Sequence, residues 1–461
     1  MPGVMLDAQA ADVSGTAASP PGRAEPPPLA DVRVVEIGRF ASAPSCATVL
    51  ADWGADVVKI EPPGGDPARG PGSITSVGGP PVNPRFEVHN RSRRSVVLDL
   101  QRPEGRTVAD RILAGSDVLV TNLRPDALER LRLDAATVRA QHPRLIVAQI
   151  SGYDLATSQA GERSYDHGAY WSYAGVASLF AASDGEPPQP AGGFGDRAAG
   201  SMLAGAVAAA LFRRSRTGEG SHVTTSLVNT GLWLMASDVS DVVATGRPHR
   251  SPDRRRASIP TVNCFRTADA RWLWLQVMHP EQDWPALIAA LDAPWLDEDP
   301  RFQGGNLRRL KANQEPLVEL LDEVFRAHTL AEWRARFATH GITWAPVRTL
   351  EEAVGDDEVR RSSAFVEFDD DDGVHHVSVN TPCAFDGTTR PASRAPQIGE
   401  NTDEVLASFG VSEGEIDALR QSGVLGARGA LASERSRLTW DTGTTSSSTT
   451  ETGVSSAFID R

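Results

Sequence analysis

Lysine is nearly absent from this chain of 461 residues, whose 46 basic residues include only two lysines, Lys59 and Lys311. The remaining basic residues are arginines, whose planar guanidinium groups bind phosphates and carboxylates through paired hydrogen bonds. Acidic residues are in excess, and the formal net charge is −14. Such a charge argues against general binding of nucleic acid and against an anionic membrane surface. We therefore expect neither nucleic acid nor membrane as a partner.

Cysteine and long apolar runs are also scarce. The three cysteines, Cys46, Cys264 and Cys383, are widely spaced and odd in number, which favours a reducing compartment without a disulfide framework. We therefore expect a cytoplasmic protein. No stretch of 18 apolar residues and no metal-ligand spacing occurs, so neither a membrane span nor a metal site is predicted. Residues 1–30 lack the basic and apolar regions of a secretory signal.

The length and an apolar content of 40% predict a globular protein with more than one domain. Both ends have biased composition, rich in Ala, Pro and Gly at the start and in Ser and Thr at the end, and are expected to be disordered. The expected divisions are a disordered extension (1–27), the first part of a large domain (28–228), a helical linker (229–250), a small α+β domain (251–345), a return linker with the rest of the large domain (346–427) and a disordered tail (428–461).

Strand and helix patterns alternate through the first half of the chain. Strand patterns occur at 32–37, 55–61, 95–100, 117–122 and 145–150, and the segments between them include helical patterns such as 45–53 and 103–114. This alternation predicts an α/β fold, with a mostly parallel sheet in a Rossmann-like large domain. Ligands bind such sheets beyond the carboxyl ends of the strands. The polar side chains in or near those loops are Arg39, Asn122, Arg124, Arg130 and Arg163.

The middle of the chain has a different pattern. A long helix is expected over 224–243, and 265–277 predicts a β-hairpin with its turn at 268–270. Six of the ten tryptophans lie between Trp272 and Trp344, which predicts a smaller α+β domain with an aromatic core. The arginine run 254–256 is open to two interpretations, a solvated loop or a group that recognises an anionic substrate or the phosphate of a cofactor.

A glycine-rich stretch, Gly192–Arg197, precedes a run of small and apolar residues that predicts a buried helix over 198–212. This places the Asp196 carboxylate near a helix N-terminus, where backbone N–H groups favour an anion. Asp196 could therefore be a simple N-cap or a functional group. Residues 193–198 also fit the dinucleotide fingerprint G-x-G-x-x-A, but a proline-rich segment precedes them instead of a strand. We therefore reject a dinucleotide site here.

Five segments, in this order, resemble one known family. They are LADWGADVVKIEP (50–62), NRSRRSVVLDL (90–100), the segment 117–130 with Asn122 and Arg124, RTGEGSHV (216–223) and APQIGENTDEVL (395–406). Together they resemble the class III coenzyme A transferases, the group of formyl-CoA, carnitine-CoA and succinyl-CoA-dependent transferases that includes α-methylacyl-CoA racemase. The resemblance extends over most of residues 29–426.

The resemblance implies functions for individual residues. Asp196 falls on the family's nucleophile, which would attack an acyl-CoA thioester and carry first a mixed anhydride and then an aspartyl-CoA thioester. It further implies acyl-CoA and a carboxylic acid as substrates, no metal, and a homodimer of interlocked chains. The residues that would line the CoA site are Arg39, Ala41, Ser42, Leu98, Leu100, Asn122, Leu123, Arg124, Arg130 and Arg163.

Three departures from the family pattern bear on the reaction. Tyr165 stands before Asp166 where the racemases have a histidine, and the acidic partner of that histidine falls on His279. A racemase needs two bases at one carbon, so the changes favour a transferase. An acyl-CoA racemase or isomerase and a catalytically silent CoA-binding protein are the alternatives. Asp166 could assist acyl transfer or cap a helix, and His279 could reach the active site or be structural. The glycine-rich loop of oxalate-type enzymes is missing, which argues against formyl or oxalyl substrates.

Overall fold

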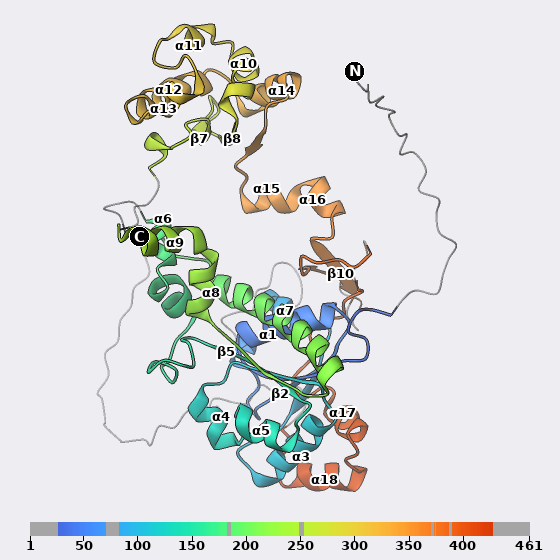
Figure 1. The fold of residues 1–461 in the computed structure, drawn as a ribbon. Helices are drawn as coiled ribbons and strands as arrows, with labels where there is room; N and C mark the ends of the chain where they lie inside the picture. The colour runs from blue at the N-terminus through green and yellow to red at the C-terminus, as the bar shows by residue number, and fades with distance from the viewer. Residues whose placement is uncertain are drawn as a thin grey trace, which may run out of the picture.

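The computed structural model describes residues 26–70, 83–181, 186–248, 253–369, 373, 375–386 and 390–426 (Figure 1). The disorder expected for 1–27 and 428–461 concerns segments that lie, apart from residues 26 and 27, outside the described residues. Among the helices that are described, none is long and apolar enough to cross a membrane.

A six-stranded parallel sheet forms the centre of the large unit, with the strand order β3-β2-β1-β4-β5-β6. The strands are β1 (Arg33–Ile37), β2 (Asp56–Glu61), β3 (Arg94–Val97), β4 (Val118–Thr121), β5 (Ile146–Ser151) and β6 (His222–Ser226). Most are apolar on both faces because helices cover both sides of the sheet. The expected parallel α/β sheet is confirmed. The strand order reverses between β1 and β4, and such a switch point is where open α/β sheets bind ligands.

The edge strand β6 overturns one prediction. Residues 224–243 were expected to form one helix, but 222–226 pair with β5 and only then do α8 (Leu227–Leu234) and α9 (Ala236–Thr245) follow. The polar sequence of β6 hides its strand character because its side chains are largely solvent-accessible at the sheet edge.

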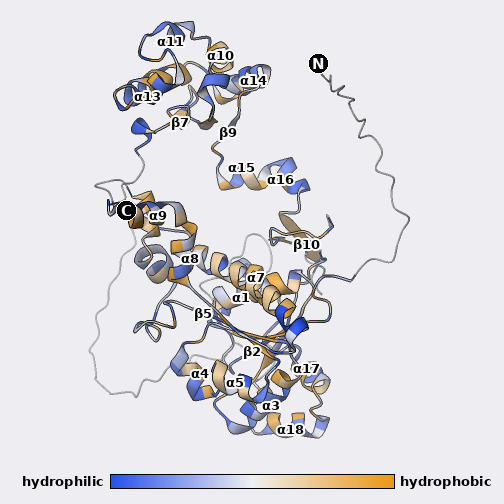
Figure 2. Ribbon diagram, in the orientation of Figure 1, coloured by the Kyte–Doolittle hydropathy of each residue, from blue (hydrophilic) through white to orange (hydrophobic). Residues whose placement is uncertain are grey.

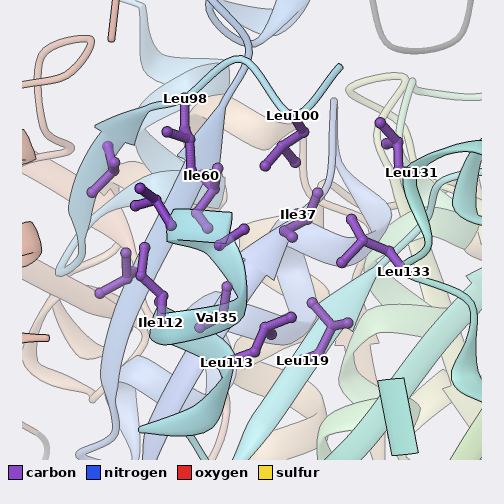
Figure 3. Packing of buried hydrophobic residues seen from close by; sticks show 14 of the residues in the cluster. Val35, Ile37, Ile60, Leu98, Leu100, Ile112, Leu113, Leu119, Leu131 and Leu133 are labelled. Atoms are coloured by element: carbon purple, nitrogen blue, oxygen red, sulfur yellow. The ribbon is translucent and has the colours of Figure 1, made fainter. Parts of the chain in front are cut away.

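Five helices cover one face of the sheet (Figure 1). They are α3 (Pro103–Ala114), α4 (Pro125–Leu131), α5 (Ala135–Gln141), α17 (Thr402–Ser408) and α18 (Glu413–Gln421). Figure 2 shows the outer side of α3 as strongly hydrophilic, and its inner side contributes Ile112 and Leu113 to the apolar cluster drawn in Figure 3. The chain therefore returns to its first domain through α17 and α18 after an intervening small unit.

Two helices that are far apart in the sequence, α1 (Ser42–Asp52) and α7 (Phe194–Thr217), pack together on the opposite face of the sheet. They approach so closely that a Cβ on Gly200 would lie 2.6 Å from Ser45 Cβ and 2.8 Å from Ser42 O. A helix was expected over 198–212, and α7 covers that range, but within this chain it is buried along one stripe only. The neighbouring elements are η1 (Pro67–Arg69), α2 (Pro84–Asn90), the π-helix η3 (His167–Tyr173) and α6 (Val176–Phe180).

A smaller unit follows α9 and lies apart from the sheet in Figure 1. Its antiparallel sheet has the order β7-β8-β9, and the predicted hairpin is confirmed as β7 and β8. Phe325 stacks on Phe265 and contacts Trp333 and Phe337 in an aromatic core. The elements are η4 (Arg254–Arg256), β7 (Val262–Arg266), β8 (Trp272–Gln276), α10 (Pro280–Leu291), α11 (Pro294–Glu298), α12 (Gly305–Arg309), α13 (Lys311–Phe325), α14 (Leu330–His340) and β9 (Trp344–Pro346).

The return segment carries α15 (Leu350–Gly355), α16 (Asp357–Arg361) and the antiparallel hairpin of β10 (Phe365–Asp369) and β11 (His375–Val379). In the arginine run of η4, Arg254 makes a bidentate ion pair with Asp322, with distances of 2.9 and 2.6 Å. That residue therefore ties η4 to α13 inside the small unit, which favours a structural role for it over recognition of an anion.

Candidate active site

The turn that joins β1 to α1 lies at the point where the strand order reverses. Arg39 N donates a 3.0 Å hydrogen bond to Asn122 Oδ1, and Asn122 Nδ2 donates to Arg39 O and to Ser42 Oγ, both at 2.8 Å. Asn122 follows β4, so its amide side chain links the carboxyl ends of the two central strands. This places Ser42, the first residue of α1, at the carboxyl edge of the sheet, where the sequence predicted a ligand site.

A buried group of charged side chains supports the same turn from within the protein. Asp66 Oδ1 accepts a 3.1 Å hydrogen bond from Phe40 N, and Asp66 Oδ2 lies 2.9 Å from Lys59 Nζ. Lys59 Nζ also lies 2.6 Å from Glu36 Oε1, and Arg93 pairs with the other oxygen of Glu36. These four side chains, here called the buried cluster, are completely shielded from solvent. Burial alone would lower the pKa of Lys59, but the neighbouring carboxylates Asp66 and Glu36 raise it overall.

Phe40 makes the need for this support evident. Its φ is 60°, a left-handed conformation that is unfavourable for a residue with a bulky side chain. The hydrogen bond from its N–H to Asp66 holds that conformation, and the exposed ring packs edge-on against Tyr165 at 5.9 Å between centroids. The turn is therefore fixed from the buried cluster on one flank and from Asn122 on the other.

Asp196 lies in the first turn of α7. The helix begins at Phe194, and its N-cap is Gly193, with φ 76° and no side-chain cap. The interpretation of Asp196 as the N-cap is therefore wrong, because the helix starts earlier than its apolar run. The carboxylate is half-buried, and the nearby Ser42 side chain has a lowering effect on its pKa. Ser42 Oγ in turn accepts a hydrogen bond from Asn122 Nδ2, which holds this hydroxyl group in place.

The surroundings of Asp196 favour its neutral form. Burial and the nearby charge of Asp166 raise the pKa of Asp196 to about 7, against the smaller lowering effects of Arg197 and Ser42. A carboxyl group with a pKa near neutrality keeps a large fraction of reactive anion at pH 7 while carrying a poorly solvated charge. Perturbed groups of this kind are typical of functional sites.

Asp166 is buried, with 5% of its surface exposed, directly before the π-helix. It makes no side-chain cap to that helix. Instead, Asp166 Oδ1 accepts a 2.9 Å hydrogen bond from Gly195 N in the first turn of α7. A Cβ on Gly195 would lie 2.4 Å from this oxygen and 2.2 Å from Tyr170 Cγ. Glycine is therefore required before Asp196, and Asp166 anchors the turn that carries the candidate nucleophile.

The other two residues expected to assist are placed differently. Tyr165 is 70% exposed and contacts Phe40, so it lies at the rim of this site. His279 is the N-cap residue of α10 in the small unit, where it lines a shallow hollow with Glu281, Gly305 and Arg309. Figure 1 shows α10 far from α7. Within one chain, His279 is therefore not part of the group around Asp196.

The expected CoA-binding residues divide into three groups. Arg39, Ala41, Ser42 and Asn122 form the turn described above. Arg124, the N-cap residue of α4, lies 3.5 Å from Asp126, which also pairs with the exposed Arg130 at 2.9 Å. Arg163 is exposed on the loop that follows β5. Arg124 and Arg163 lie in loop segments beyond the strand ends, and Arg130 lies in the last turn of α4. They could hold phosphate groups there through charge-assisted hydrogen bonds.

The three leucines of that set are packing residues in the structure. Leu98, Leu100 and Leu123 are 0–2% exposed and belong to one apolar cluster, of which Figure 3 shows Leu98 and Leu100. Their side chains cannot form an open slot for adenine, so any contact they make with a ligand involves the main chain. The part of the chain that the structure describes holds no group of three or more His, Cys, Asp or Glu residues able to bind a metal ion.

Sequence reasoning missed two features of the site. It assigned Ser42 to CoA alone and overlooked this residue as a neighbour of Asp196. It also overlooked Asp66, although Gly64-Gly65-Asp66 follows β2 at the same edge of the sheet as Arg39 and Asn122. The position of Asp66 beyond a strand end was the available signal.

Comparisons with known proteins match most of the chain. The model of a family described as CoA-transferase family III matches residues 29–402. The chain is 30% identical over 399 residues to the (R)-2-hydroxy-4-methylpentanoate CoA-transferase of Clostridioides difficile, which covers 86% of this chain and 99% of that protein. It is also 29% identical over 407 residues to α-methylacyl-CoA racemase of Homo sapiens, which covers 86% of this chain and 97% of that protein.

Among solved structures, a CAIB/BAIF family protein from Brucella suis has a TM-score of 0.72 and 27% sequence identity to this chain. The match covers 84% of this chain and 100% of that one. The similarity therefore extends through both the large and the small unit.

Proposed function

The chain belongs to CoA-transferase family III, and we propose that it transfers CoA from an acyl-CoA thioester to a carboxylic acid through covalent intermediates on Asp196. The observation that carries this proposal is the placement of Asp196. Its carboxylate lies in the first turn of α7 at the switch point of the sheet, with Ser42 as a neighbour, and burial together with Asp166 raises its pKa.

The first half of the reaction consumes the acyl-CoA. The Asp196 carboxylate attacks the thioester carbonyl and the C–S bond breaks. CoA departs as thiolate, and a mixed anhydride remains on Asp196. The thiolate then attacks the aspartyl carbonyl of that anhydride, which releases the donor carboxylate and leaves an aspartyl-CoA thioester on residue 196. Covalent catalysis of this kind divides one difficult exchange into easier steps.

The second half repeats these steps with the acceptor. The acceptor carboxylate attacks the aspartyl carbonyl, CoA thiolate leaves, and a second mixed anhydride forms. Attack of the thiolate on the acceptor's acyl carbon then gives the new acyl-CoA and restores the Asp196 carboxylate. Each tetrahedral intermediate needs a hydrogen-bond donor at its oxyanion, and we assign the Ser42 hydroxyl to those formed on the aspartyl carbonyl.

CoA itself would bind beyond the strand ends. We assign Arg39, Ala41, Asn122, Arg124, Arg130 and Arg163 to this subsite, together with the main chain at Leu98, Leu100 and Leu123. In support, these residues lie in segments that follow β1, β3, β4 and β5 at one edge of the sheet, with Arg130 in helix α4 after β4. Guanidinium groups there suit the 3′-phosphate and pyrophosphate of CoA.

We also propose a homodimer in the reducing environment of the cytoplasm. The outer surfaces of α7, α8 and α9 expose Phe212 (66%), Trp233 (63%) and Val243 (79%). Large exposed apolar side chains are common at protein interfaces, and a second copy of the chain would cover these three. Sedimentation should then give about twice the chain mass of 49.2 kDa, whereas a monomer at all concentrations would contradict the dimer. All three cysteines are free thiols, which suits a reducing compartment.

A racemase or isomerase is the second candidate, supported by the identity with the human racemase and by the neighbouring carboxylates Asp166 and Asp196. Tyr165 and His279 count against it because they replace the paired bases. A protein that binds CoA without catalysis is the third candidate. We expect no exchange of the α-proton of a 2-methylacyl-CoA in deuterated buffer. Rapid exchange that depends on Asp196 would instead establish the racemase.

Covalent trapping tests the transferase directly. The purified protein is screened with a panel of acyl-CoAs and labelled acids that includes 2-hydroxy-4-methylpentanoate, succinate, glutarate and acetate. Acyl-CoA without acceptor should load the enzyme. Hydroxylamine should then convert residue 196 to a hydroxamate, and borohydride should reduce its thioester, both within the peptide 190–197. A label on Asp166, or no loading by any acyl-CoA, would contradict the proposal.

A further inference from the structure

Arg197 directly follows the candidate nucleophile on α7, and its side chain folds back over the glycine turn before the helix. Arg197 Nη2 lies 3.5 Å from Gly192 O, and Nη1 lies 3.0 Å from the position that a Cβ on Gly193 would occupy. That same position is 3.8 Å from Ala41 Cβ. The guanidinium group is therefore held beside the first turn of α7, toward the β1–α1 turn, instead of extending away from the protein.

No carboxylate of the described residues lies within ion-pair distance of this guanidinium group, whose one hydrogen bond is the long contact to Gly192 O. Nearby arginines differ: Arg91 pairs with Asp52 at 2.6 Å, and Arg69 pairs with Glu61 at 2.7 Å. The charge of Arg197 still lowers the pKa of Asp196. Arg197 thus influences Asp196 electrostatically but makes no ion pair with it. The N–H donors of its guanidinium group are therefore available to another anion.

The second half of the proposed reaction requires such an anion. The acceptor must arrive as a carboxylate, beside an aspartyl carbonyl that lies close to the negative charge of Asp166. A fixed guanidinium group offsets that repulsion and binds a carboxylate through two parallel hydrogen bonds. The same subsite would hold the donor carboxylate as it leaves, because both acids occupy equivalent positions on the aspartyl carbonyl.

We propose that Arg197 binds the carboxylate of the acceptor acid and presents one of its oxygens to the acyl carbon of residue 196. The inference rests on the proposed function and assigns the acid subsite within it. In this step an O–C bond forms between acceptor and aspartyl carbon, the C–S bond breaks, and CoA leaves as thiolate. Arg197 remains protonated throughout, so no further reactant is needed.

The test separates binding of the acid from loading by acyl-CoA. Arg197→Leu and Arg197→Lys are compared with the wild type, using the most active pair of acyl-CoA and acid from the panel above. Arg111→Leu, which changes an exposed arginine on α3 across the sheet, is the matched control. KM for the acid, KM for the acyl-CoA and the rate of covalent loading are measured separately.

Arg197→Leu should raise KM for the acid by roughly 10- to 100-fold, the usual effect of losing a hydrogen bond to a charged group. Product inhibition by the donor acid should weaken in parallel, while KM for the acyl-CoA stays near that of the wild type. Arg197→Lys should give an intermediate KM for the acid because it keeps the charge and loses the fork, and Arg111→Leu should match the wild type. An unchanged KM for the acid in Arg197→Leu would overturn this assignment alone, whereas a wild-type protein that exchanges no acid overturns the proposed function.

Discussion

Two groups of charged side chains lie against the β1–α1 turn, and they are balanced in opposite ways. In the buried cluster, the carboxylates Glu36 and Asp66 are matched by Lys59 and Arg93 without any exposure to solvent. In the site, the carboxylates Asp166 and Asp196 lie close together, and neither makes an ion pair among the described residues, although Arg197 is near enough to Asp196 to lower its pKa. Matched charges fix a conformation, whereas unmatched charges leave a group ready to react or to bind.

The difference has an energetic reason. The two charges of a buried ion pair lose hydration energy, and their mutual attraction offsets that loss. Removing one partner therefore leaves the other charge buried without compensation. For a buried carboxylate without a cationic partner, the surroundings instead raise the pKa, so that the neutral form is favoured. The same turn thus joins a rigid support to a reactive group, and three substitutions can separate the two.

The largest effect is expected for the nucleophile itself. Asp196→Asn should reduce transfer on the order of 10⁴-fold or more, because removal of a covalent nucleophile abolishes the main pathway. Its thermal unfolding and CoA affinity should remain close to those of the wild type, since the amide keeps the size of the side chain. Transfer rates, thermal melts and CoA titration measure the three quantities. An active Asp196→Asn enzyme would show that the unmatched charge is not the nucleophile.

The next effect breaks the matched group. Lys59→Met should lower the free energy of unfolding by about 3–5 kcal/mol, because it leaves Asp66 and Glu36 buried without their shared cation. Thermal unfolding beside the wild type and Asp196→Asn measures this. The exposed pair of Arg130 and Asp126 provides the control, since Arg130→Met should change stability by less than about 1 kcal/mol. Equal melts for Lys59→Met and the wild type would contradict the supporting role of the buried cluster.

The smallest effect concerns the coupling of the two site carboxylates. The rate of covalent loading should rise with pH with a midpoint near 7, because the Asp196 anion attacks and its pKa is raised to about 7. Asp166→Asn should move this midpoint to lower pH, since the amide can still accept from Gly195 N but lacks the charge that raises the pKa. Single-turnover loading across pH measures the shift. An unmoved midpoint would mean that Asp166 serves as an anchor alone.

The same pKa predicts a stability change of known sign. The folded protein favours the neutral form of Asp196. Its contribution to stability is therefore complete below the ordinary carboxyl pKa and is lost as the pH rises through about 7. Relative to Asp196→Asn, the wild type should lose thermal stability between about pH 4 and 7.

Much of the fold could be predicted because its signals are local. Buried parallel strands read as continuous apolar runs, as at Val118–Thr121, and helices such as α3 begin at a proline and carry one apolar face. β6 could not be predicted, because an edge strand buries little and tolerates threonine and histidine at most positions. The start of α7 was placed too late for a similar reason, since its first turn begins at glycines instead of a side-chain cap.

The site was predictable only in part. The glycine pattern and the family resemblance indicated Asp196, but the contacts that define its chemistry join distant segments. Asn122 to Ser42, Asp166 to Gly195 and Asp66 to Phe40 are hydrogen bonds that depend on the topology of the sheet. Exposure also depends on packing, which is why Leu98, expected in an open site, lies in the apolar core.

The close approach of α1 and α7 at Gly200 has a consequence for how this protein can diverge. Any side chain at Gly200 would meet the backbone of α1 at Ser42 and Cys46, at 2.8 and 2.9 Å. Neither atom can move aside as the end of a flexible side chain could. A mutation there would separate the helix that carries Asp196 from the helix that carries Ser42. During evolution, position 200 is therefore restricted to glycine. New substrate preferences must arise from changes in loops that leave the packing of α1 and α7 unchanged.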